Sequence, residues 1–168
     1  VKLSDKDATN QLDLYGLVEF GRDTTAKLKL LPSDVILEHQ QWKIQEQVRV
    51  RLLNGKTQVS GFDLSNGRQR VKINGFITDN PLDKLKIEFE DFNMATLNQL
   101  ARPSGIELGG TLNGSAELSG ITKTPGFESD LGIDSLTMNQ TFIGKVKIVS
   151  SLDNDKKLAN VKFNILNR

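Results

Sequence analysis

Residues 108–120 read LGGTLNGSAELSG, and small or apolar residues occupy nearly every second position of this stretch. One side is formed by Leu108, Gly110, Leu112, Gly114, Ala116, Leu118 and Gly120, the other by Thr111, Asn113, Ser115, Glu117 and Ser119. A period of two predicts a β-strand with one apolar and one solvated face. At roughly 3.3 Å per residue the strand would span about 43 Å, which exceeds the usual five or six residues. The stretch therefore predicts a large, curved sheet.

The same alternation recurs along most of the chain and is interrupted by turn-forming pairs such as Asn54-Gly55 and Asn66-Gly67. It predicts an all-β chain of about ten or eleven strands in a long, curved antiparallel meander of consecutive hairpins. Residues 94–101 are the candidate for a short helix, capped by Asn93 and ended by Pro103. A single segment, 1–168, is thus divided into strands over 10–92, a helix over 93–103 and strands over 104–168.

The residues between the apolar positions are strongly charged. They include Arg49, Arg51, Arg68, Arg70, Lys72, Lys84, Lys86, Glu88, Glu90, Lys145 and Lys147. Such a sheet has one dry and one wet face, as antiparallel sheets commonly do. It must hide its apolar side by folding into a barrel, a sandwich or a half-open trough.

Composition removes several classes of function. The 22 Lys and Arg residues balance 21 Asp and Glu residues, so a net charge of +1 gives no global field for nucleic acid or an acidic membrane surface. The absence of cysteine excludes disulfides and thiolate chemistry but selects no compartment. The chain begins at Val1 and contains no apolar stretch of membrane-spanning length. We expect it to be an internal slice of a longer protein.

The sequence holds no catalytic constellation, and we expect no enzyme activity, cofactor or metal site. His39 is the only histidine and has no nucleophile-elbow sequence near it. Glu88 and Glu90 share a face with Lys86, which indicates a solvated outer surface rather than a general acid and base. The basic stripe that includes Arg68 and Arg70 has no interleaved aromatic residues, so nucleic-acid binding is not expected.

The order of several short motifs resembles the repeat region of bacterial TamB proteins, the inner-membrane component of the translocation and assembly module, within the AsmA-like group. In the first half these motifs are Trp42-Lys43-Ile44, Phe62-Asp63-Leu64 with Asn66-Gly67, and Val71-Lys72-Ile73-Asn74-Gly75. The second half is similar to members from the Bacteroidetes, in Phe89-Glu90-Asp91-Phe92-Asn93-Met94, Leu112-Asn113-Gly114, Leu118-Ser119-Gly120, Pro125, Phe127 and Ile143-Gly144. The resemblance covers residues 10–166.

This resemblance implies a half-open trough, or β-taco, with a hydrophobic interior. It places the segment in the periplasm of a Gram-negative bacterium, in a protein anchored in the inner membrane outside this segment. The implied function is phospholipid transfer between the two membranes, assistance to outer-membrane protein assembly, or both. The implied partners are phospholipid or other acyl chains and an outer-membrane assembly protein of the Omp85 type.

The side chains expected to line the groove alternate along the strands. They are Leu12, Leu14, Val18, Val50, Val59, Val71, Ile73, Ile87, Phe89, Leu108, Leu112, Ala116, Leu118, Leu131, Ile133, Val146 and Ile148. The glycines expected on the same face are Gly16, Gly61, Gly75, Gly110, Gly114 and Gly144. These glycines have two interpretations that can hold together: they leave room for acyl chains, or they permit curvature and close packing of the strands.

A different class of function stays open. A β-sandwich or jelly-roll module on the cell surface could bind glycan or protein with its loops. That architecture predicts a filled core and exposed aromatic loops, whereas a lipid groove predicts an open apolar face. With one Tyr and one Trp in the chain, aromatic residues for such a loop platform are scarce.

Overall fold

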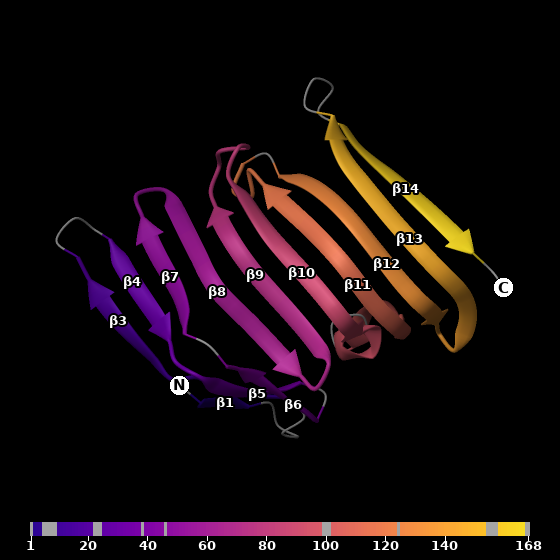
Figure 1. Ribbon diagram of the computed structural model, residues 1–168, viewed down its shortest axis with the longest axis horizontal. Coiled ribbons are helices and arrows are strands. Elements are labelled where there is room, and N and C mark those ends of the chain that lie inside the picture. Colours follow the sequence, from indigo (N-terminus) through magenta and orange to yellow (C-terminus); the bar gives the residue numbers. More distant parts are fainter. Residues whose placement is uncertain are drawn as a thin grey trace.

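A computed structural model describes residues 2–4, 10–21, 25–37, 39–45, 47–98, 102–123, 125–153 and 158–166. The all-β prediction is confirmed, since every strand of the described residues belongs to one open antiparallel sheet of 14 strands (Figure 1). In chain order these are β1 (Lys2–Ser4), β2 (Gln11–Asp13), β3 (Gly16–Phe20), β4 (Ala26–Leu30), β5 (Ser33–Leu37), β6 (Gln40–Ile44), β7 (Val48–Leu53), β8 (Lys56–Asn66), β9 (Gln69–Ile77), β10 (Lys84–Asn93), β11 (Leu108–Ser119), β12 (Gly126–Met138), β13 (Thr141–Asp153) and β14 (Leu158–Leu166).

From β8 to β14 the sheet is the expected meander, in which each strand pairs with the next in the sequence. The N-terminal strands are ordered differently. β8 is long enough to carry two branches end to end: Thr57 to Ser60 pair with β7, whereas Leu64 and Ser65 pair with β6. One branch runs β7–β4–β3 and the other β6–β5–β2–β1. We call this arrangement the β8 fork; Figure 1 shows β5 and β6 at an angle to β8 and β9.

The helix expected over 94–101 is described only in its first part. A 3₁₀ helix, η1, spans Met94–Leu97, and the Asn93 side chain caps it by accepting a hydrogen bond from the Ala95 N–H. Residues 99–101 lie outside the described residues. A second 3₁₀ turn, η2, spans Arg102–Ser104. Within the part of the chain that the structure describes, no helix is long and apolar enough to cross a membrane.

Bulges interrupt the ladder on alternate strands, β8, β10 and β12. Two residues face one across the pairs β8/β9, β10/β11 and β12/β13, and the second residue of each bulge has a positive φ: Gly61 (73°), Asp91 (46°) and Ser135 (53°). Bulges bend a strand and increase its twist. The bulges therefore bend β8, β10 and β12 individually, each at a different level along its strand.

Two of these bulges are fixed by an asparagine on the next strand. The Gly61 N–H donates to Asn74 Oδ1 at 2.7 Å, and the Asp91 N–H donates to Asn113 Oδ1 at 2.8 Å. In each case a glycine follows the asparagine, Gly75 with φ 127° and Gly114 with φ 119°. A Cβ on Gly75 would collide with the Lys84 carbonyl oxygen, and one on Gly114 with that of Asp130. Close strand packing thus accounts for these two glycines.

Gly114→Ala should destabilise the sheet, because the new Cβ meets the Asp130 carbonyl oxygen and the backbone must hold a left-handed φ. Such strain costs about 1–3 kcal/mol, and the collision adds to it. Gly132→Ala on the neighbouring strand is the matched control, because its Cβ would enter open space. Urea unfolding should show a large loss of unfolding free energy for Gly114→Ala. The loss for Gly132→Ala should be less than about 0.5 kcal/mol. Equal losses would contradict this explanation of the Asn-Gly pairs.

Candidate functional site: the apolar face of the sheet

The strand register gathers the expected lining residues into rows across the sheet. One row crosses seven strands and contains Leu64, Val71, Phe89, Gly114, Leu131, Ile148 and Phe163. A second row contains Val18, Leu28, Val50, Val59, Gly75, Leu85, Leu118 and Phe127. Side chains opposite one another on the same face of an antiparallel pair are close enough to touch. The two rows therefore form a nearly continuous apolar face from edge to edge.

One end of this face is packed. Trp42 is fully buried, and its ring centroid lies 5.8 Å from that of Phe92, although β8 and β9 separate their strands in the sheet order. The buried cluster also contains Val35, Ile44, Val48, Met94, Leu112, Ile133 and Val146. Met94 belongs to η1, so the short helix covers this end. Large aromatic side chains supply most of such packing energy.

Several expected lining residues therefore belong to a core. Leu112 is only 6% exposed, and Ala116, Ile133 and Val146 are equally buried. Others are partly buried and pack against the cluster: Leu12, Leu14, Val50, Val71, Phe89, Leu108, Leu131 and Ile148. Any lipid that reached this end would have to displace packed side chains. Sequence periodicity could not show this, because it gives the face of a residue and not what lies above it.

The rest of the expected lining is not among the residues that pack against the cluster. Val59, Ile73, Ile87 and Leu118 are half-buried, and Val18 on the edge strand is 54% exposed. We call these five residues the open region. Two expected glycines differ in the same way: Gly16 is exposed, whereas Gly144 is buried. The apolar face thus has a packed end and an open region.

A polar pair within the apolar face was not expected. Ser129 and Ser150 are buried, and their hydroxyl oxygens lie 2.9 Å apart in a hydrogen bond. They are opposite each other between Ala116 and Val161 in a third cross-strand row. A buried hydroxyl needs such a partner to avoid a desolvation penalty of about 1–3 kcal/mol. The signal available in the sequence was a serine at an apolar position of each strand.

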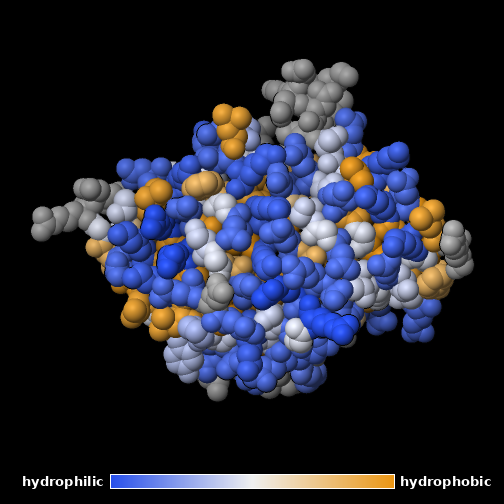
Figure 2. Space-filling model, in the orientation of Figure 1, coloured by the Kyte–Doolittle hydropathy of each residue, from blue (hydrophilic) through white to orange (hydrophobic). Residues whose placement is uncertain are grey.

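The opposite face is an array of ion pairs across neighbouring strands. Lys84 Nζ lies 2.7 Å from Glu117 Oε2 and 2.8 Å from Glu128 Oε2, and these hydrogen bonds raise the pKa of Lys84. Lys72 Nζ lies 2.8 Å from Glu90 Oε1, which lowers the pKa of that carboxyl group. Figure 2 shows hydrophilic residues over most of one face, with hydrophobic ones gathered toward its left and right margins. Exposed pairs of this kind add little stability.

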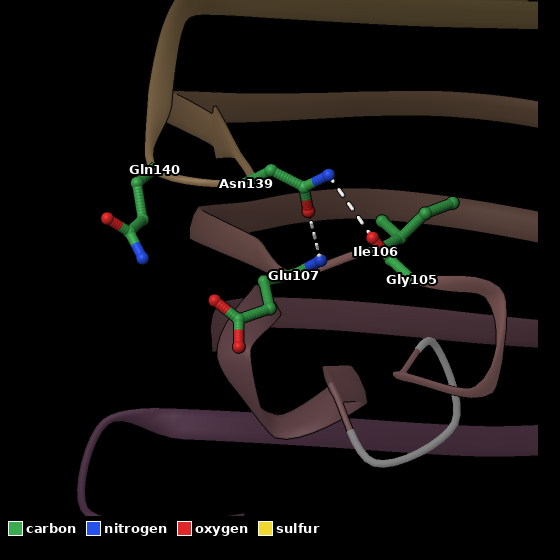
Figure 3. A pocket seen from close by; sticks show the side chains of 5 residues that line it. All are labelled: Gly105, Ile106, Glu107, Asn139 and Gln140. Carbon is green, nitrogen blue, oxygen red and sulfur yellow. Dashed lines mark hydrogen bonds between the residues drawn. The ribbon is translucent and has the colours of Figure 1, made fainter.

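The hollow drawn in Figure 3 has a structural explanation. It measures about 280 Å³ and is lined by Gly105, Ile106, Glu107, Asn139 and Gln140. Asn139 Oδ1 accepts from the Glu107 N–H at 2.7 Å, and Asn139 Nδ2 donates to the Gly105 carbonyl at 3.2 Å. The side chain thereby ties the segment before β11 to the β12–β13 turn. The lining residues offer one carboxylate, Glu107, and no second ionisable partner for acid–base chemistry.

Comparison with known proteins adds no relative to this description: the chain matches no family model, no curated protein and no solved structure.

The two parts of the apolar face should respond differently to a buried charge. Leu112→Asp places a carboxylate in the packed cluster, so we expect a loss of about 3–5 kcal/mol of unfolding free energy, or no folded protein. Val59→Asp puts the same group in the open region, where water can reach it, and should cost about 1–2 kcal/mol. Circular dichroism with thermal melting measures both. A Val59→Asp variant that unfolds as readily as Leu112→Asp would show that the open region is also a sealed core.

The outer face should tolerate the loss of charge. Lys145 Nζ lies 2.8 Å from Asp134, and Lys147 Nζ lies 3.1 Å from Asp130, but all four side chains are more than half exposed. Replacing both lysines with Gln should change the unfolding free energy by less than about 0.5 kcal/mol per site. Urea titration at low and high salt checks this. A loss of several kcal/mol would assign these pairs a structural role.

Proposed function

We propose that this chain is a periplasmic segment of a TamB-like envelope protein whose apolar sheet face shelters lipid acyl chains between the inner and outer membranes. The observation that carries the proposal is the open region: half-buried and exposed apolar side chains lie side by side on a sheet with no second sheet packed over it in the described residues. A globular protein rarely leaves such a surface in contact with water. An acyl chain is an occupant of matching chemistry.

The energetic reason is simple. Exposing an acyl chain to water costs about 0.8 kcal/mol per CH₂ group, or on the order of 12 kcal/mol for about sixteen carbons. An apolar face that spans the sheet removes much of this cost at every point along the path. The charged outer face keeps the rest of the sheet hydrated. The proposal includes an inner-membrane anchor outside this segment and an Omp85-type partner, as the resemblance implies, and the same face could instead assist outer-membrane protein assembly.

The sandwich alternative receives less support. A sandwich has two packed sheets, whereas the described strands form one. The exposed aromatic side chains Tyr15, Phe20, Phe127, Phe142 and Phe163 lie on strands or beside them, not on one cluster of loops. Recognition of a glycan by aromatic loops would need these side chains to lie together on one cluster of loops.

Binding of a fatty acid of about sixteen carbons that carries an environment-sensitive fluorophore tests the proposal on the 168-residue chain. We expect saturable fluorescence enhancement, weakened at least about tenfold by Val59→Asp, because a hydrated carboxylate then lies on the lipid path. Gln58→Asp is the matched control: it adds the same group one residue away on the outer face, opposite Arg51. Equal weakening by both variants, or no saturable binding by the wild-type chain, would contradict a lipid-binding face.

A further inference from the structure

Three strands end the described sheet, β1, β3 and β14, and two of them, β3 and β14, complement each other. The fork leaves β3 at the end of one branch, and β14 ends the sheet on the other side. Their apolar side chains are exposed, with Val18 and Phe20 on β3 and Val161, Phe163 and Ile165 on β14. Free edges of this kind are usually protected by an inward-pointing charge, a proline or a bulge. Within the described residues, neither strand has any of these.

β14 of one copy can pair with β3 of a second copy that is related to the first by translation alone. Nine antiparallel pairings lead from β3 through β4 and β7 to β14, so β3 and β14 run in opposite directions within one sheet. A second copy moved sideways along the sheet therefore presents its β3 antiparallel to β14 of the first. Figure 1 shows the two strands at opposite margins with opposed arrows. The apolar faces of both copies then lie on the same side.

One register matches both faces at once. If Lys162 is opposite Glu19, the apolar side receives Val161 beside Phe20, Phe163 beside Val18, and Ile165 beside Gly16. On the outer side, the single charged residue of described β14 meets the single charged residue of β3, and their signs are opposite. Glu19 already forms a pair with Lys29 on β4 at 3.4 Å. Lys162 would extend the cross-strand pattern that Lys84 makes with Glu117 and Glu128.

We propose that β14 of one copy adds to β3 of a second copy of this chain, so that copies associate head to tail and extend the sheet. The contact is heterologous: the copy that contributes β14 keeps its β3 free, the copy that contributes β3 keeps its β14 free, and further copies can add. Five residues of β3 make a small interface, so we expect weak association, in the range of about 10–100 μM. The proposal does not depend on lipid binding, and the two can fail separately.

Blocking each edge in turn tests the head-to-tail contact. Phe163→Lys places an inward-pointing charge on β14, and Val18→Lys does the same on β3. By sedimentation velocity, the wild-type chain should form dimers and larger species as its concentration rises. Each variant alone should stay monomeric, because growth needs both edges. An equimolar mixture should form dimers and nothing larger, because one intact β14 meets one intact β3.

Other contacts give other results. If Val18→Lys alone dimerises, β14 pairs with itself; if Phe163→Lys alone dimerises, β3 does so. Either result overturns the proposal, as does a wild-type chain that stays monomeric at several hundred micromolar, about tenfold above the expected range. Leu82→Lys is the control, since it makes the same kind of change at an exposed turn residue and should associate like wild type. Circular dichroism verifies that each variant is folded.

Charge reversal tests the register. Glu19→Lys and Lys162→Glu should each weaken association several-fold, and the double variant should recover it, because the opposite signs are restored. Non-specific adhesion of apolar edges predicts no such rescue. Failure of the double variant to recover would overturn the proposed register.

Discussion

The sheet depends on its register, and the register depends on the three bulges of β8, β10 and β12. A shift of one residue would turn every apolar side chain of a strand toward water. Asn74 and Asn113 hold two of the bulges by accepting the N–H groups of Gly61 and Asp91. At the third, Lys145 lies opposite the bulge and pairs with Asp134. Because the rows of apolar residues exist only in this register, the candidate functional face depends on these polar contacts.

The apolar face is divided into the packed end and the open region. The packed end, around Trp42, Phe92 and Met94, fixes the fold, whereas the open region offers half-buried side chains to an occupant. Because the packed end stabilises the fold by itself, the open region can stay uncovered. The Ser129–Ser150 hydrogen bond lies between the two adjoining rows and gives the face a polar spot that an acyl chain would have to pass. In the proposed function, the residues that would contact lipid therefore differ from those that stabilise the fold.

Much of the fold was predictable from the period of two. The stretch 108–120 predicted both the strand and its apolar face, and Leu112 and Ala116 lie on that face, although they were expected to line an open groove and are buried. Three features were beyond the pattern. The β8 fork arises from pairing between distant strands, which alternation does not encode. The roles of Gly75 and Gly114 depend on how closely the next strand approaches, and the burial of Leu112 depends on η1 and the β6 branch lying near it.

The β8 fork also has a consequence for folding. Strands β9 to β14 pair only with their sequence neighbours, and such local contacts form fast. The pairs β2–β5 and β4–β7 each enclose two other strands and β6–β8 encloses one, so these pairs must close longer loops. Both branches join the rest of the sheet by pairing with β8. Neither can join it until β8 has formed. We infer that the C-terminal meander forms first during folding. The two N-terminal branches form later and are the first to detach when the chain opens locally.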